Sequence, residues 1–163
     1  MNVHSLCLFV LTLCLGLGSA RGFSGAETDG FSSAMTVKEA LAHLEKMGRK
    51  PKILDERLIL YEQPDGSHCA VSFTGKEGKA GIFQRSVSAT FPKFVATLML
   101  LERRHGIPAR TFGMAADPTN AYSSETVTVV WNTGADQIQL EYNGTTATIR
   151  YNDRTHAKAF LVD

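Results

Sequence analysis

The apolar positions between residues 36 and 48 follow a helical period. Four of them recur every three or four residues and fall on one stripe of a helix: Val37, Leu41, Leu44 and Met47. Thr36 and Glu39 have the spacing of a capping box, which satisfies amide groups of the first turn. Gly48 suits the C-terminal cap. We therefore predict a helix from about Val37 to Met47.

The period changes to two after residue 56, as is typical of strands with one buried face. Turn-forming residues interrupt the alternation at Pro64-Asp65-Gly66 and again at residues 75–79. Cys69, Val71 and Phe73 fall on one face of the middle run. The pattern predicts three strands: Arg57–Glu62, Ser67–Thr74 and Gly81–Ser88.

A second helix is predicted to begin near Phe91-Pro92, because proline is pre-set for the first turn of a helix. It ends at His105-Gly106-Ile107-Pro108. Its apolar residues cover most sides rather than one stripe: Phe94, Val95, Leu98, Met99, Leu100 and Leu101. We therefore expect it to be the central helix of the hydrophobic core.

The last third of the chain is predicted to hold a long connection and three strands: Ala109–Ser124, then Glu125–Asn132, Asp136–Tyr142 and Thr145–Tyr151. Asn143-Gly144 favours a two-residue type I′ turn between the last two strands. Such a turn fixes the register and places the paired apolar residues on one face. The expected pairs are Tyr142 with Thr145, Leu140 with Ala147, and Ile138 with Ile149.

The order of elements is helix, three strands, helix, three strands. This αβββ-αβββ order predicts an α+β fold in which antiparallel sheet packs against two helices. The two helices begin about 54 residues apart, which is compatible with a pseudo-repeat, although the halves share too little sequence identity to establish one. We expect residues 36–163 to form a single domain.

The N-terminal residues are typical of a secretory signal peptide. A short apolar run, Leu6–Leu17, precedes Gly18-Ser19-Ala20, where small residues stand at the positions of a cleavage site. Residues 1–20 are therefore predicted to be a signal peptide, and Ala20-Arg21-Gly22 offers a second site that would release a chain beginning at Phe23. A buried helix or a retained anchor is the alternative. We expect residues 21–35 to be a flexible leader and the mature chain to be exported, periplasmic or extracellular.

Composition and charge narrow the function classes. The 163 residues are 44% hydrophobic and 20% charged, as in an ordinary globular protein, so the composition argues against disorder. A net charge of +1 argues against nucleic acid as a partner. Residues 76–110 carry seven basic and two acidic side chains. This stretch is either a solvated face or a patch for an anionic partner.

Motifs for catalysis, metal binding or cofactors are weak. Cys69 is the sole cysteine after the signal peptide, and its alternation with Val71 and Phe73 predicts a buried, unreactive thiol. His68 points to the opposite face of the strand. The spacing of the His, Cys and acidic residues predicts neither a zinc nor a calcium site. We expect no cofactor.

The sequence favours a non-catalytic binding domain whose partner is a protein or a small anionic ligand. An enzyme with a site of dispersed residues and a structural component of an envelope complex remain alternatives. The candidate recognition surface combines the end of the second helix with the long connection: Arg103, Arg104, Arg110, Phe112 and Tyr122. Asn143-Gly144-Thr145 is a glycosylation sequon at Asn143.

Overall fold

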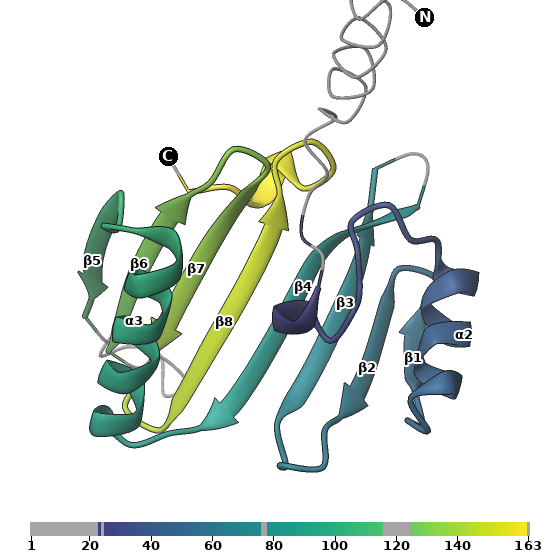
Figure 1. Cartoon of the computed structure of the whole chain (residues 1–163), viewed down its shortest axis with the longest axis horizontal. Helices are drawn as coiled ribbons and strands as arrows, with labels where there is room; N and C mark the ends of the chain where they lie inside the picture. Colours follow the sequence, from purple (N-terminus) through teal and green to yellow (C-terminus); the bar gives the residue numbers. More distant parts are fainter. Residues whose placement is uncertain (1–22, 24, 76–77, 116–124, 163) are drawn as a thin grey trace, which may run out of the picture.

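The computed structural model describes residues 23, 25–75, 78–115 and 125–162, in which eight strands form one antiparallel sheet (Figure 1). The order across the sheet is β1-β2-β3-β4-β8-β7-β6-β5. The strands are β1 (Lys52–Asp55), β2 (Leu58–Glu62), β3 (His68–Thr74), β4 (Lys79–Ser88), β5 (Arg110–Met114), β6 (Thr126–Asn132), β7 (Asp136–Tyr142) and β8 (Thr146–Asp153). The predicted α+β class is confirmed.

Two helices, α2 (Val37–Lys46) and α3 (Phe91–His105), cover the same face of the sheet at its opposite ends (Figure 1). A short 3-10 helix, η1 (Ala26–Thr28), lies between them, and a second, η2 (Lys158–Phe160), follows β8. Each half of the chain is thus a helix followed by four consecutive strands, and the halves join where β4 pairs with β8. We call the side that carries the helices the helix face and the other side the open face.

Local sequence accounts for the ends of α2. The Thr36 backbone N–H donates to Glu39 Oε2 at 2.7 Å, and the Glu39 N–H donates to Thr36 Oγ1 at 3.4 Å, so the predicted capping box is present. Gly48 has φ of 66°, a left-handed conformation that favours glycine. The Arg49 N–H then donates to the Leu44 carbonyl at 2.9 Å, which closes the helix end.

The stretch expected to be a flexible leader instead contributes buried residues: Phe23, Thr28, Phe31 and Ser33. We call residues 25–35 the N-terminal segment. Phe31 is fully buried, and its ring lies against those of His43, Tyr61 and Phe83, with centroids 4.9, 5.7 and 5.9 Å away. The segment crosses the sheet between the helices. Phe23 and Phe31 anchor it there, although they are isolated in the sequence and follow no periodic pattern.

The prediction that the second helix is central is wrong. α3 packs against the helix face at one end of the sheet, where it buries Phe94 and Leu101. The Phe94 ring stacks on Tyr142 of β7 with centroids 4.9 Å apart. Met99 and Leu100 remain 52% and 42% exposed. A helix in a two-layer fold has only one buried side, which leaves the other apolar positions at the surface.

The predicted register of the last hairpin is wrong by two residues. The observed pairs are Tyr142 with Ala147, Leu140 with Ile149, and Ile138 with Tyr151. The reason lies in the turn, where Asn143 Oδ1 accepts the N–H groups of Thr145 and Thr146 at 3.2 and 2.8 Å. These side-chain bonds stabilise a longer loop than a type I′ turn. A shift of two preserves the face of each residue, so the predicted alternation survives.

Both edge strands escaped the sequence analysis. Arg110–Met114, placed within the predicted connection Ala109–Ser124, is β5, which pairs with β6 along the edge of the sheet. All four residues of β1 at the other edge are exposed. Neither strand shows the alternation of buried and exposed positions by which strands are recognised. Residues 116–124 of that connection lie outside the described residues.

The open face is lined with polar side chains. Gln84, Arg150 and Gln139 are neighbours in register across β4, β8 and β7. The Arg150 guanidinium donates to Gln84 Oε1 at 3.1 and 3.2 Å. The C-terminal residues lie on this face, because the Val162 N–H donates to Gln137 Oε1 at 2.8 Å.

Candidate ligand-binding cleft

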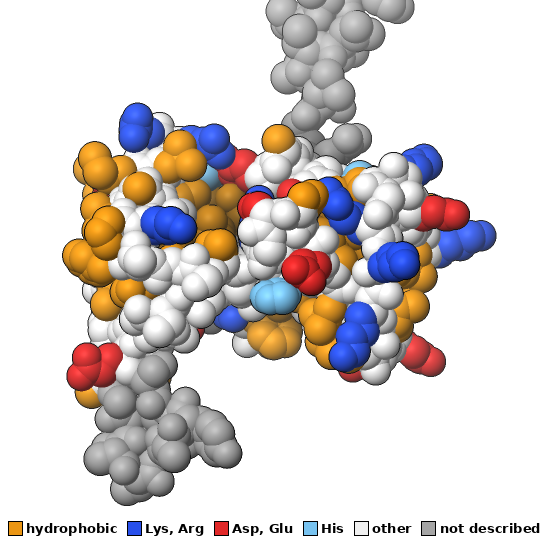
Figure 2. Space-filling view, turned by 90° about the horizontal axis from the view of Figure 1, so that it is seen from below, with side chains coloured by type: hydrophobic (Ala, Val, Ile, Leu, Met, Phe, Trp, Pro, Cys, Tyr) orange, Lys and Arg blue, Asp and Glu red, His pale blue; other side chains and the backbone are white. Residues whose placement is uncertain are grey.

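A cleft of about 370 Å³ opens on the helix face between α3 and the N-terminal segment, above β4 and β8. We call it the α3 cleft. Val87 of β4 and Ile149 of β8 contribute apolar side chains to its floor, and Leu100 contributes one from α3. Figure 2 shows hydrophobic side chains gathered at the end of the molecule that carries α3.

The wall supplied by α3 follows from helical spacing. Thr97, Leu100, Leu101 and Arg104 line the cleft, and their intervals of three and four residues place them on one side of the helix. Three of these residues offer carbon surface, and Arg104 adds a guanidinium close to the C-terminal end. The wall therefore changes from apolar to cationic along its length.

Glu27 of the N-terminal segment forms the polar end of the cleft. It pairs with Arg104, accepts a hydrogen bond from the Tyr151 hydroxyl at 3.0 Å, and lies 3.4 Å from His105 Nε2. Burial alone raises the pKa of Glu27, but the bonds from Arg104 and Tyr151 and the nearby His105 hold it below the usual value. Glu27 is thus ionised, and its contacts hold the N-terminal segment against α3 and β8.

Arg85 of β4 carries the second guanidinium of the cleft. Its Nη2 lies 2.5 Å from Asp65 Oδ2, its Nε donates to Ser67 Oγ at 3.0 Å, and its Nη1 lies 4.0 Å from Asp29 Oδ1. Hydrogen bonds from Ser67 and the charge of Arg85 lower the pKa of Asp65 to about 2. The Asp65 side chain, on the β2–β3 turn, is 55% exposed. The Asp65 carboxylate is therefore easily hydrated when it separates from Arg85.

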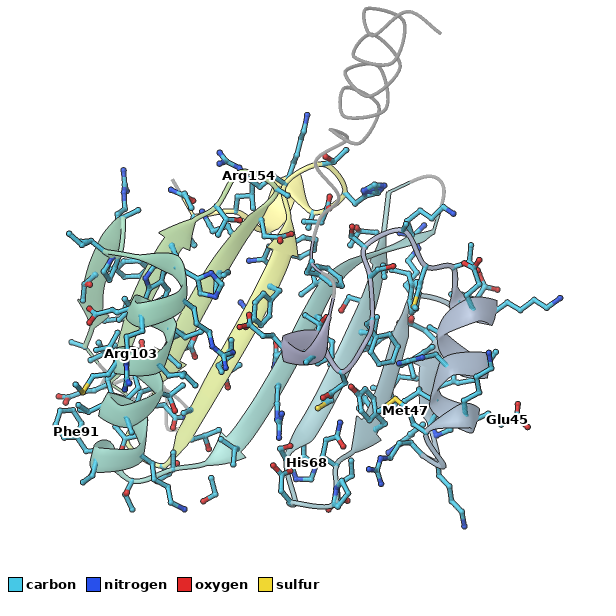
Figure 3. All side chains as sticks on the ribbon, viewed as in Figure 1. Glu45, Met47, His68, Phe91, Arg103 and Arg154 are labelled. Carbon is cyan, nitrogen blue, oxygen red and sulfur yellow. The ribbon has the colours of Figure 1, made fainter. Side chains whose placement is uncertain are left out.

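Behind Arg85, Asp29 connects the N-terminal segment to β2 and β3. Its Oδ2 accepts hydrogen bonds from the Tyr61 hydroxyl at 2.8 Å and from Gln63 Nε2 at 2.6 Å. The Cys69 thiol lies 3.8 Å from the same oxygen. Cys69 is buried as its alternation predicts, and burial raises its pKa to about 11. His68 is exposed on the open face, away from the thiol (Figure 3).

The structure separates the residues of the predicted recognition surface. Arg104 lines the α3 cleft, whereas Arg103 is exposed on α3 and donates from Nε to the Met99 carbonyl at 3.3 Å (Figure 3). Arg110 and Phe112 lie near Val162 on the open-face side of β5. Tyr122 lies outside the described residues. Thus, of the four described members, only Arg104 belongs to the cleft.

Sequence analysis missed Glu27, Arg85 and Tyr151 as site residues. They come from the N-terminal segment, β4 and β8, and the β4–β8 pairing brings the last two strands together. No local motif signals such a convergence. The sequon residue Asn143 lies in the β7–β8 turn, and its glycosylation stays a prediction.

Within the described ranges, no group of three or more His, Cys, Asp or Glu side chains is placed to hold a metal ion. None of the helices in that part of the chain has the length and apolar run needed to cross a membrane. Comparisons of the chain with protein-family models, curated proteins and solved structures find no match.

Proposed function

We propose that this chain is an exported binding protein whose α3 cleft takes a small amphipathic molecule with an apolar body and a carboxylate or phosphate group. The observation that carries the proposal is an apolar floor that ends at two guanidinium groups, those of Arg85 and Arg104. A cleft of about 370 Å³ also has the size of a small-molecule site.

The two arginines have different roles in this proposal. Arg104 is occupied by Glu27, which Tyr151 also holds, so this pair positions the cleft wall. Arg85 is paired with Asp65, which is mostly exposed. An anionic ligand displaces Asp65 at small cost because that carboxylate returns to water. Arg85 is therefore the group that contacts the ligand's charge.

Export is supported by the short apolar run and the small residues that follow it. A binding protein that works outside the cytoplasm needs a fold that is stable without a partner protein. The buried aromatic cluster around Phe31 supplies such a core. Cys69 is the free cysteine of the described chain and is buried, so its thiol is protected in an oxidising compartment.

Titration calorimetry with octanoate, octyl phosphate and octanol tests the proposal. We expect the two anions to bind and the neutral alcohol of the same chain length to bind at least tenfold more weakly. Arg85→Gln should weaken anion binding about tenfold, the loss of one charged contact. Arg103→Gln is the matched control, since it removes a positive charge near the cleft but outside it.

The proposal is wrong if none of the three probes binds, or if octanol binds as tightly as octanoate. An equal loss of affinity in Arg85→Gln and Arg103→Gln would also contradict it, because a general charge effect would then explain the binding. Chemical conversion of a bound probe would point instead to the enzyme alternative.

A further inference from the structure

The Asp136 carboxylate, half-buried at the start of β7, has no cationic partner among the described residues. The backbone N–H of Phe23 is a neutral donor to this carboxylate and lowers its pKa, whereas Oδ1 is buried and has no hydrogen-bond partner among the described residues. Asp153 of β8 is its partner in register, so a second carboxylate lies beside it. A half-buried carboxylate whose buried oxygen has no donor is costly to keep ionised.

The charged side chains of the described residues near Asp136 have other partners. Asp153 Oδ1 accepts the N–H groups of Thr155 and His156 at 2.8 and 2.7 Å and lies 3.1 Å from His156 Nδ1. The Arg154 guanidinium donates to the Thr133 carbonyl at 3.4 Å. Burial and the charge of Asp153 raise the pKa of Asp136 to about 6. The surroundings of Asp136 therefore favour an added positive charge.

Phe23 is held firmly at this carboxylate. Its side chain is only 2% exposed and its ring lies 6.5 Å from that of Phe83. Its carbonyl accepts the Ser33 N–H at 3.1 Å. These contacts fix the Phe23 nitrogen beside Asp136 through its own ring and carbonyl, so they do not depend on any residue that precedes it.

The sequence offers a cleavage site directly before this residue, after Gly22. Cleavage there hydrolyses the Gly22–Phe23 peptide bond, and the Phe23 nitrogen becomes a primary ammonium group. We propose that the mature chain begins at Phe23 and that its α-ammonium group pairs with the Asp136 carboxylate. The pair replaces a neutral donor with a charged one at a buried acceptor.

This pairing bears on the α3 cleft and rests on the export proposed above. The segment that begins at Phe23 supplies Ala26 and Glu27 to the cleft wall. A stronger anchor at Phe23 keeps that wall in place. Removal of residues 1–22 thus strengthens the anchor of the cleft wall, which links maturation of the chain to ligand binding.

Two chains released from a removable N-terminal fusion test the pairing without any export step. One begins at Phe23 and the other at Gly22, so they differ by a single natural residue and both keep every described residue. We expect the Phe23 chain to have the higher Tm at pH 7. Asp136→Asn should lower the Tm of the Phe23 chain by several degrees. In the Gly22 chain the same change should be neutral or stabilising, because it removes a buried charge.

An equal effect of Asp136→Asn in both chains overturns the pairing. A second measurement needs no mutation. The stability advantage of the Phe23 chain should be present at pH 7, where the carboxylate is ionised and the amine is protonated, and should disappear as pH rises through the raised pKa of the paired amine. An advantage that persists at pH 11 contradicts the proposal.

The processing site is tested separately by the intact mass of the full chain, expressed with residues 1–22 and recovered after export. The mass of a chain beginning at Phe23 is expected. A mass that begins at Arg21 contradicts the assigned first residue. An uncleaved chain contradicts the export proposal, whereas the stability comparison still decides whether Asp136 accepts an ammonium group.

Discussion

The two halves of this protein share a topology but seal their helices to the sheet differently. In the α2 half, Phe31 fills the space beside the helix and contacts His43, Tyr61 and Phe83, so the layers close. In the α3 half the N-terminal segment reaches the helix through Glu27 and Arg104, and an apolar cleft remains beneath that ion pair. Both halves contribute to one core, but the N-terminal segment fills the space beside α2 and leaves a cleft beside α3.

The largest expected difference between the halves is in stability. Phe31→Ala should lower the free energy of unfolding by about 3–5 kcal/mol, because it empties a fully buried ring site. Leu100→Ala on the cleft wall should lower it by less than about 1 kcal/mol, because its side chain is 42% exposed. Urea unfolding followed by circular dichroism measures both. Equal losses would remove the distinction between a sealed and an unsealed half.

A smaller effect on stability is expected at Cys69, which lies on β3 in the α2 half. Cys69→Ser should lower the free energy of unfolding by about 1–3 kcal/mol, because a hydroxyl replaces a buried thiol. The thiol of the native chain should resist labelling at pH 8, since it is buried and its pKa is raised to about 11. Rapid labelling of the folded protein would show that this half opens or that the thiol is reactive.

The ion pair that bounds the cleft should contribute less than the aromatic seal. Glu27→Gln should lower the free energy of unfolding by about 1–2 kcal/mol, as for a hydrogen bond to a charged group. The pKa of Glu27 is lowered in the folded state, so its contribution is present above the ordinary range of a glutamate. It is lost as pH falls through the lower folded value.

Unfolding measured from pH 7 down to pH 3 checks this contribution. The gap between wild type and Glu27→Gln should narrow with acidification. Arg103→Gln, on the same helix but away from Glu27, is the control and should change stability little. A gap that widens toward pH 3 would mean that Glu27 is not stabilised as an anion.

The smallest stability effect is expected at Asp65, where the same substitution should strengthen ligand binding. Asp65→Asn removes an exposed partner of Arg85 and should change the free energy of unfolding by about 0–1 kcal/mol. It should also tighten octanoate binding several-fold, because the competing carboxylate is gone. Calorimetry on the two proteins gives the comparison. A weaker affinity would show that Asp65 supports the ligand instead of competing with it.

The strands and helix ends that could be predicted from the sequence are those with a local signal. Thr36, Glu39 and Gly48 predict the ends of α2. The alternation around Cys69 predicts β3 and the side chains that face inward. β1 and β5 lack this signal. Both are edge strands outside the core, so neither has a buried face that requires apolar residues at alternate positions. The turn at Asn143 was misjudged because its side chain competes with the turn backbone.

The candidate site was largely beyond reach of sequence reasoning. Only Arg104 was named, from the basic end of the second helix. Glu27 lies in a stretch whose small and polar residues resemble a linker, yet Phe31 anchors that stretch in the core. Arg85 and Tyr151 become neighbours through strand pairing across more than sixty residues of chain. Such convergence depends on topology, which residue spacing does not encode.

Methyl-resolved NMR during titration with octanoate tests the central claim most directly, because it locates the bound molecule in one half of the protein. The account predicts shifts at Val87, Leu100 and Ile149 in the α3 cleft. Leu44 and Ile59, buried in the α2 half, should stay in place. Shifts centred on the α2 half, or no shifts at millimolar octanoate, would contradict the assignment of the α3 cleft as the binding site.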